Sequence, residues 1–188
     1  GGELEVVARW RGHLRYDMMA WVAVHIATHY KTALLVYESN TFELRTAMDY
    51  AGADAGDHIR GILYEIGDVY PNLYYRRHTS EEDIRRGDTK KIGFQTNRKT
   101  KQDMIDHFTR LLEDGQFIGP DPRMYKEAVI YQVYADGHYG NIPGAGNHDD
   151  ILMSDMIAAF ISRDLPLPSI EREYHLHQTK STINESFF

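Results

Sequence analysis

The chain has 188 residues, of which 42% are hydrophobic and 26% are charged, and its formal net charge is −7. This length and composition are typical of one folded domain with a buried core, and exclude a disordered chain. The absence of cysteine excludes disulfides and thiolate metal sites. No apolar run approaches the ~20 residues that cross a bilayer, and no secretory signal is visible.

The first half of the chain alternates between extended and helical patterns. Extended segments are expected at residues 5–10, 33–37 and 73–75, and helices at 17–30, 41–48 and 57–70. Residues 33–37 (ALLVY) form a continuous apolar run, which is typical of a strand buried on both faces in a parallel sheet.

The second half begins with a polar loop at 79–90 and a short extended piece at 92–95. A helix is expected from Thr100, where Thr100 and Asp103 resemble a capping box, to Gly115. Three further segments follow: residues 122–134 fit a helix or a long strand, 137–146 a glycine-rich loop, and 148–163 a last helix capped by Asn147. The alternation predicts an α/β domain.

The charge of the chain is unevenly distributed. Residues 76–101 hold nine Lys or Arg against four Asp or Glu, a net charge of +5, so the rest of the chain carries −12. A solvated loop is one explanation, but Lys and Arg also neutralise phosphates when a protein binds nucleic acid. The candidate phosphate-binding residues are Arg76, Arg77, Arg85, Arg86, Lys90, Lys91, Arg98, Lys99 and Lys101.

Glu38 directly follows the strand predicted at residues 33–37. Open α/β sheets place their ligand sites at the carboxyl ends of strands, so this carboxylate is well placed for chemistry. An ordinary solvated strand end fits the same position equally well.

Asp149 and Asp150 open the last predicted helix. Acidic residues in a first turn favour the helix dipole by about 0.3–1 kcal/mol, which is a purely structural explanation. However, Asp149 precedes Met153 by four positions and Asp150 precedes Ile157 by seven, so helical spacing places both carboxylates over the buried face. Two unpaired acids there would repel each other, and a divalent cation would relieve that repulsion.

Carboxylates in a chain without cysteine predict a hard, oxygen-preferring ion such as Mg²⁺ or Mn²⁺. Zinc stays open because His148 adjoins the two acids, although the chain has no H-E-x-x-H motif. The candidate catalytic and metal-binding residues are therefore Glu38, Asp149 and Asp150, with His148 as a candidate accessory residue.

Several stretches, taken in order, resemble the C-terminal nuclease domain of the terminase large subunit of tailed bacteriophages. Glu38-Ser39-Asn40 resembles the second acidic motif of that family. Residues 92–97 (IGFQTN), 99–101 (KTK) and the helix ending at 113–115 (EDG) are similar to its middle region. Residues 136–141 (DGHYGN) and 146–153 (GNHDDILM) resemble its third acidic motif and the helix that follows.

This resemblance implies a ribonuclease H-like mixed sheet flanked by helices, whose acidic residues bind two Mg²⁺ or Mn²⁺ ions and cleave concatemeric double-stranded DNA. It implies a nuclease domain at residues 1–165 and a polar C-terminal tail at 166–188. The implied partners are DNA, the terminase ATPase domain of the same full-length chain, the portal ring and the small terminase subunit. The implied location is the cytoplasm of the bacterial host.

The chain departs from this family in two ways. The family's nuclease begins with a strand that carries its first catalytic Asp and then a second strand, whereas this chain opens in what resembles the third. It also lacks the G-x-x-x-x-G-K-[ST] motif of the packaging ATPase. We therefore expect a weak or inactive nuclease, in which residues 5–10 or a second copy cover an exposed edge at 33–37.

Two other interpretations compete with a terminase nuclease. One is another ribonuclease H-like nuclease, of the resolvase or transposase type. The other is a catalytically incomplete module that docks a packaging motor onto another ring. Metal binding separates the last interpretation from both enzymes.

Overall fold

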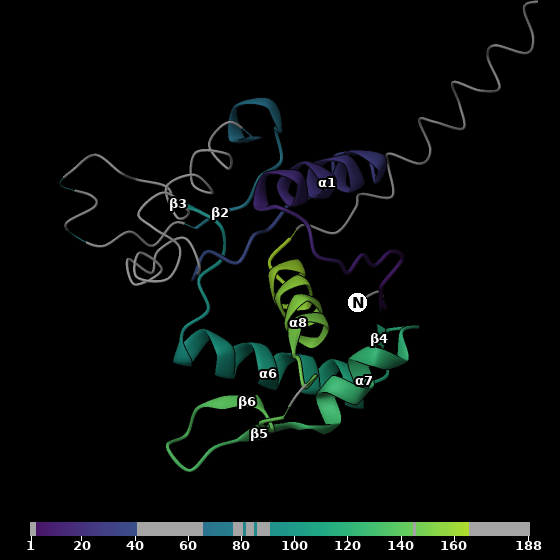
Figure 1. The fold of residues 1–188 in the computed structure, drawn as a ribbon, viewed down its shortest axis with the longest axis vertical. Coiled ribbons are helices and arrows are strands. Elements are labelled where there is room, and N and C mark those ends of the chain that lie inside the picture. The colour runs from purple at the N-terminus through teal and green to yellow at the C-terminus, as the bar shows by residue number, and fades with distance from the viewer. Residues whose placement is uncertain are drawn as a thin grey trace, which may run out of the picture.

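The structure is a computed structural model that describes residues 3–40, 66–76, 81, 85, 91–144 and 146–165. It is a mixed α/β arrangement in which short parallel and antiparallel strand pairs accompany longer helices (Figure 1). The helices are α1 (Tyr16–His29), α6 (Arg98–Glu113), α7 (Pro122–Val129) and α8 (Asp150–Ser162). The strands are β1 (Leu4–Glu5), β2 (Tyr75–Arg76), β3 (Lys91–Ile92), β4 (Phe117–Ile118), β5 (Tyr131–Val133) and β6 (Tyr139–Asn141).

Helix α6 begins with a capping box one turn earlier than the sequence pattern predicts. The side chain of Asn97 accepts hydrogen bonds from the backbone N–H groups of Lys99 and Thr100, both at 3.0 Å. The Thr100 hydroxyl in turn accepts the Asn97 N–H at 2.8 Å, so Thr100 closes the box and does not open it. The helix ends before Gly115, whose φ of +65° is a conformation that glycine adopts without strain.

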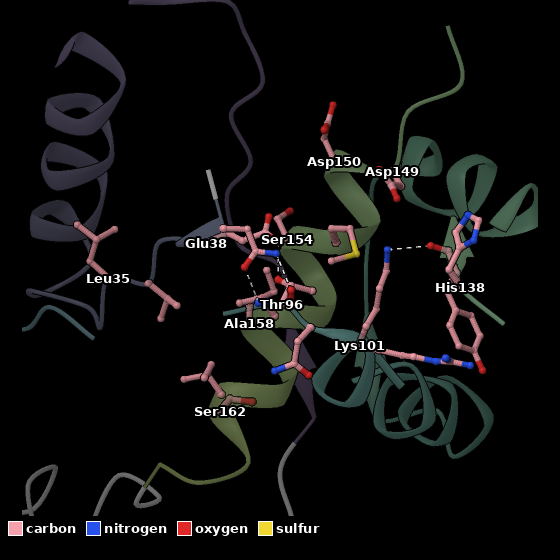
Figure 2. A pocket seen from close by; sticks show the side chains of 18 of the residues that line it. Leu35, Glu38, Thr96, Lys101, His138, Asp149, Asp150, Ser154, Ala158 and Ser162 are labelled. Carbon is pink, nitrogen blue, oxygen red and sulfur yellow. Dashed lines mark hydrogen bonds between the residues drawn. The ribbon is translucent and has the colours of Figure 1, made fainter. Parts of the chain in front are cut away.

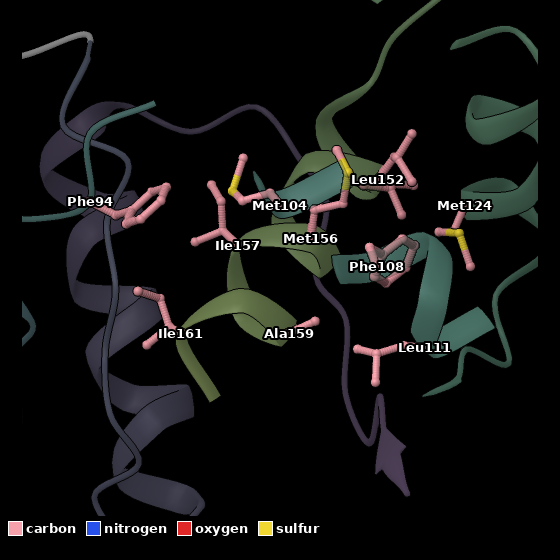
Figure 3. Close-up of a cluster of buried hydrophobic side chains, with 11 residues drawn as sticks. Phe94, Met104, Phe108, Leu111, Met124, Leu152, Met156, Ile157, Ala159 and Ile161 are labelled. Carbon is pink, nitrogen blue, oxygen red and sulfur yellow. The ribbon is translucent and has the colours of Figure 1, made fainter. Parts of the chain in front are cut away.

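The main hydrophobic core lies between α6, α7 and α8 (Figure 3). Met104 and Phe108 on α6, Met124 on α7 and Met156 on α8 are each 2% exposed or less. Burial of one such side chain contributes about 1.5–3 kcal/mol, so this packing fixes how the three helices cross. Helix α8 is buried on several faces, which explains why its sequence is apolar almost throughout.

A second, smaller core joins α1 to the segments before β2. Ala20, Val24 and Ala27 of α1 pack with Ile66 and Tyr70, all of them buried. Helix α1 closely matches the helix predicted at residues 17–30, and residues 66–69 are the helical end of the one predicted at 57–70.

Residues 35–39 form an extended segment that pairs in parallel with two neighbours. Leu35 exchanges two backbone hydrogen bonds, one with Asn72 and one with Tyr74, both at 2.9 Å. Further along, Phe94 donates to the Tyr37 carbonyl and accepts from Ser39, both at 2.7 Å. The parallel pairing expected at 33–37 is present as two isolated bridges, and the carboxyl end of the segment lies beside Phe94. Residues 34–37 are half-buried, so the expected burial on both faces is wrong.

The strand predicted at residues 5–10 is shorter and lies elsewhere. Only Leu4–Glu5 is a strand, and it pairs in parallel with β4, not with residues 33–37. Residues 5–10 therefore do not cover the open edge as expected. Within the described part of the chain, the backbone groups of Leu34 and Val36 on that edge have no backbone partner.

The remaining predicted elements have mixed outcomes. Residues 122–134 contain both a helix and a strand, because α7 is followed closely by β5. The segment at 137–146, predicted to be a glycine-rich loop, contains strand β6. In the polar loop predicted at 79–90, the two described residues, Glu81 and Arg85, are helical. The helix predicted at 41–48 and the tail at 166–188 lie outside the described residues.

Candidate functional site

An open cavity of about 980 Å³ lies where the extended segment, α6, the β5–β6 hairpin and α8 meet (Figure 2). One wall is apolar and comes from residues 34–36 and the side of α8. The charged side chains that line the cavity are Glu38, Arg98, Lys101, Asp136, Asp149 and Asp150. Glu38 and Asp149, more than 100 positions apart in the sequence, thus line the same cavity.

Glu38 stands at the carboxyl end of the extended segment and is held there by Thr96. The Thr96 hydroxyl donates a hydrogen bond to the Glu38 carboxylate. Thr96 is itself fixed by Asn40, whose side chain accepts the Thr96 N–H at 2.9 Å and donates to the Thr96 carbonyl at 2.5 Å. This pair orients the Glu38 carboxylate, and sequence reasoning did not single out Thr96.

Asp149 and Asp150 are adjacent at the start of α8, but their carboxylates have different surroundings. Asp149 is the N-cap residue; it is half-buried, and within the described chain its carboxylate makes no capping hydrogen bond. The Asp150 side chain is 70% exposed and lies 3.6 Å from Arg11. The expectation that both carboxylates lie over the buried face is therefore wrong for Asp150. Figure 2 shows the two carboxylates pointing in different directions.

Tyr131 on β5 lies near two of the cavity carboxylates, Asp149 and Glu38. Burial raises the pKa of its hydroxyl, and the negative charges of Asp149 and Glu38 raise that pKa further. The hydroxyl contacts the sulfur of Met153 at 3.7 Å. The Tyr131 hydroxyl is therefore neutral at ordinary pH.

The cavity also contains two cations from the first turn of α6. The Lys101 ammonium donates to the Tyr139 carbonyl at 3.0 Å and lies 5.4 Å from the centre of the Tyr131 ring. The Arg98 guanidinium passes close to Gly137, where a Cβ atom would lie 2.6 Å from its Nη2 atom. Gly137 has a φ of +79°, a backbone conformation that favours glycine at this hairpin turn, whereas the flexible Arg98 side chain can move to relieve the close contact.

The hairpin between β5 and β6 contributes Asp136 and His138. The carboxylate of Asp136 accepts the His138 N–H at 3.1 Å, and this bond lowers the pKa of Asp136. The His138 ring stacks on Tyr134 with 4.1 Å between ring centres. His138 therefore lines the cavity, whereas His148, the accessory candidate from the sequence, is 57% exposed and lies 3.9 Å from Asp150.

Only some of the basic residues between 76 and 101 line the cavity. Arg98 and Lys101 line the cavity, while Lys99 and Arg85 are exposed and Lys91 is half-buried in β3. Arg76 donates to the hydroxyl of the buried Ser39 at 3.0 Å, so it also supports the segment that carries Glu38. The other three candidates, Arg77, Arg86 and Lys90, lie outside the described residues.

Glu38 and Asp149 are the candidate ligands for a divalent ion in this cavity. No cluster of three or more Asp, Glu or His side chains with metal-site geometry occurs among the described residues. Mg²⁺ is, however, commonly held by one or two carboxylates and several waters, and Glu38 and Asp149 offer such a set.

Comparison of the chain with protein-family models, with curated proteins and with solved structures gave no match. Among the described helices, none is long and apolar enough to cross a membrane.

Proposed function

We propose that this chain is a metal-dependent DNA endonuclease domain of the terminase large-subunit type, with one weak cation site at Glu38 and Asp149. The observation that carries the proposal is the cavity in which these carboxylates meet Arg98 and Lys101. A ribonuclease H-like sheet is supported by the parallel pairing of the segment that ends at Glu38 and by the helix that begins beside Asp149.

The mixture of charges suits a phosphodiester better than a neutral substrate. Arg98 and Lys101 bind the phosphate oxygens, and because both stand on α6, their spacing is set by the helix. Thr96 keeps the Glu38 carboxylate turned towards the cavity. A divalent cation held by Glu38 and Asp149 would supply a Lewis acid for hydrolysis of the phosphodiester.

The catalytically incomplete docking module is the second candidate. The absence of a three-carboxylate group from the described residues favours it, because a nuclease of this type uses several ligands for its ions. The two candidates agree on the fold and differ on whether the cavity binds a cation and cuts DNA.

Mn²⁺-dependent nicking of supercoiled plasmid by the 188-residue chain tests the proposal. We expect slow nicking that Glu38→Gln and Asp149→Asn each reduce at least tenfold, since each removes a metal ligand. Glu113→Gln is the matched control, because Glu113 is exposed at the far end of α6. Nicking that survives both site substitutions would disprove the assignment, and no nicking by any version would favour the docking module.

A further inference from the structure

Glu127 is a buried carboxylate of α7 that acts on the start of another helix. It is 6% exposed, and its Oε2 atom accepts hydrogen bonds from the backbone N–H groups of Ile151 at 2.9 Å and Leu152 at 2.8 Å. These N–H groups belong to the first turn of α8, which has no partner for them within its own helix. Glu127 therefore caps α8 from outside.

This external cap leaves the Asp149 carboxylate without a capping role. The carboxylate of an Asp at the N-cap position usually accepts hydrogen bonds from the backbone N–H groups of the first turn. Here Asp149 occupies that position but, within the described chain, makes no capping hydrogen bond, and Glu127 takes its place. The Asp149 carboxylate is consequently free to face the cavity.

Arg11 completes the arrangement. One of its nitrogen atoms lies 3.5 Å from Oε1 of Glu127, and another lies 3.6 Å from the Asp150 carboxylate. A buried carboxylate is costly unless a cation and hydrogen bonds compensate it, and Arg11 together with the start of α8 supplies both. The same guanidinium lies beside the exposed Asp150 carboxylate, which points in a different direction from that of Asp149 (Figure 2).

We propose that Glu127 is a positioning residue for the cation site: by capping α8, it releases and orients the Asp149 carboxylate. This inference rests on the proposed function, because it concerns the affinity of the Glu38–Asp149 site for a divalent cation. Glu127 itself does not line the cavity. Its substitution therefore weakens cation binding without removing a ligand.

The test measures Mn²⁺ binding to the 188-residue chain by electron paramagnetic resonance, with folding checked by circular dichroism. Glu127→Gln removes the charge, and Glu127→Asp keeps it but shortens the reach to α8. We expect each to weaken Mn²⁺ binding about tenfold, as loss of a residue that orients a ligand typically does. Asp149 is then drawn back to cap its own helix.

Asp155→Asn is the matched control. Asp155 is another buried acid with 6% exposure, bonded to Arg9 at 2.7 and 2.9 Å, but it lies mid-helix on α8 and away from the N-terminal turn. We expect this variant to lose stability and keep its Mn²⁺ affinity.

Four outcomes separate the explanations. A tenfold loss in either folded Glu127 variant but not in Asp155→Asn supports the inference. Unchanged affinity in the folded Glu127 variants, with binding lost in Asp149→Asn, would overturn it and leave the proposed function standing. If both Glu127 variants unfold while Asp155→Asn folds, Glu127 is only a stability residue and the inference fails. No Mn²⁺ binding by the unaltered chain would overturn the proposed function and this inference together.

Discussion

The α6–α8 side of the molecule and the α1 side differ in how completely their apolar surface is covered. Helix α6 buries Met104, Phe108 and Leu111 and turns mostly polar side chains outwards. Helix α1 buries Ala20, Val24 and Ala27, yet it also exposes several large apolar side chains. The exposed apolar residues of α1 include Met18 (53%), Met19 (42%), Trp21 (41%) and Ile26 (38%).

Among the described residues, the α6–α8 side therefore covers its apolar surface more completely than the α1 side does. Apolar surface of this extent and an open strand edge at residues 34–36 both favour further association. The incomplete sheet expected from the resemblance to terminase nucleases would be open at this edge, residues 34–36.

The largest expected effect comes from the α6–α8 core. Phe108→Ala is expected to lower the free energy of unfolding by about 3–5 kcal/mol, because it leaves a cavity in a fully packed core. Met18→Ala on α1 is expected to change it by no more than about 0.5 kcal/mol, since this side chain is mostly in solvent. Urea denaturation of both variants measures the difference, and equal losses would erase the contrast between the two sides.

The two tryptophans report specifically on the α1 side. Trp10 and Trp21 are 45% and 41% exposed, and the chain has no other tryptophan. We expect a second copy of the chain to cover this surface at high protein concentration, which would shield the exposed rings. Acrylamide quenching of the fluorescence should then fall by about half and the emission should shift to the blue. Unchanged quenching would mean that the exposed surface of α1 does not associate.

A smaller effect is expected for DNA binding on the α6 side. Replacing Arg98 and Lys101 together by Gln should reduce the slope of log affinity against log salt by about 2, since each lost phosphate contact contributes about 0.9. Arg110→Gln with Lys126→Gln removes the same charge from positions outside the cavity. If this control pair lowers the slope equally, the cavity cations have no special role.

The sequence predicts much of this architecture because the helices carry strong periodic patterns. The amphipathic stripe of α6 and the apolar α8 are each recognisable from their own residues. The sequence pattern places the start of α6 one turn too late, because Asn97 and Thr100 are both good capping residues and only the hydrogen bonds decide between them. Residues 5–10 have the composition of a strand, but the pairing that would extend it is absent from the described chain.

The candidate site is less predictable than the fold. Glu38 follows from a local rule about strand ends, but the difference between Asp149 and Asp150 depends on Arg11 and Glu127, which are distant in the sequence. Adjacent acids at a helix start look equivalent until the tertiary partners are known. Lys101 was recognised only as one charge in a basic run, because nothing local shows that it faces the cavity.

The most direct test of the central claim compares Mn²⁺ affinity across the neighbouring acids. Glu38 and Asp149 share one ion in this account, while Asp150 is directed to Arg11. Glu38→Gln and Asp149→Asn should each weaken Mn²⁺ binding at least tenfold, and the double variant should lose much less than the sum of the two losses, because both act on one site. Asp150→Asn should bind within about twofold of the unaltered chain. Additive losses, or a larger loss from Asp150→Asn than from Asp149→Asn, would contradict the shared site.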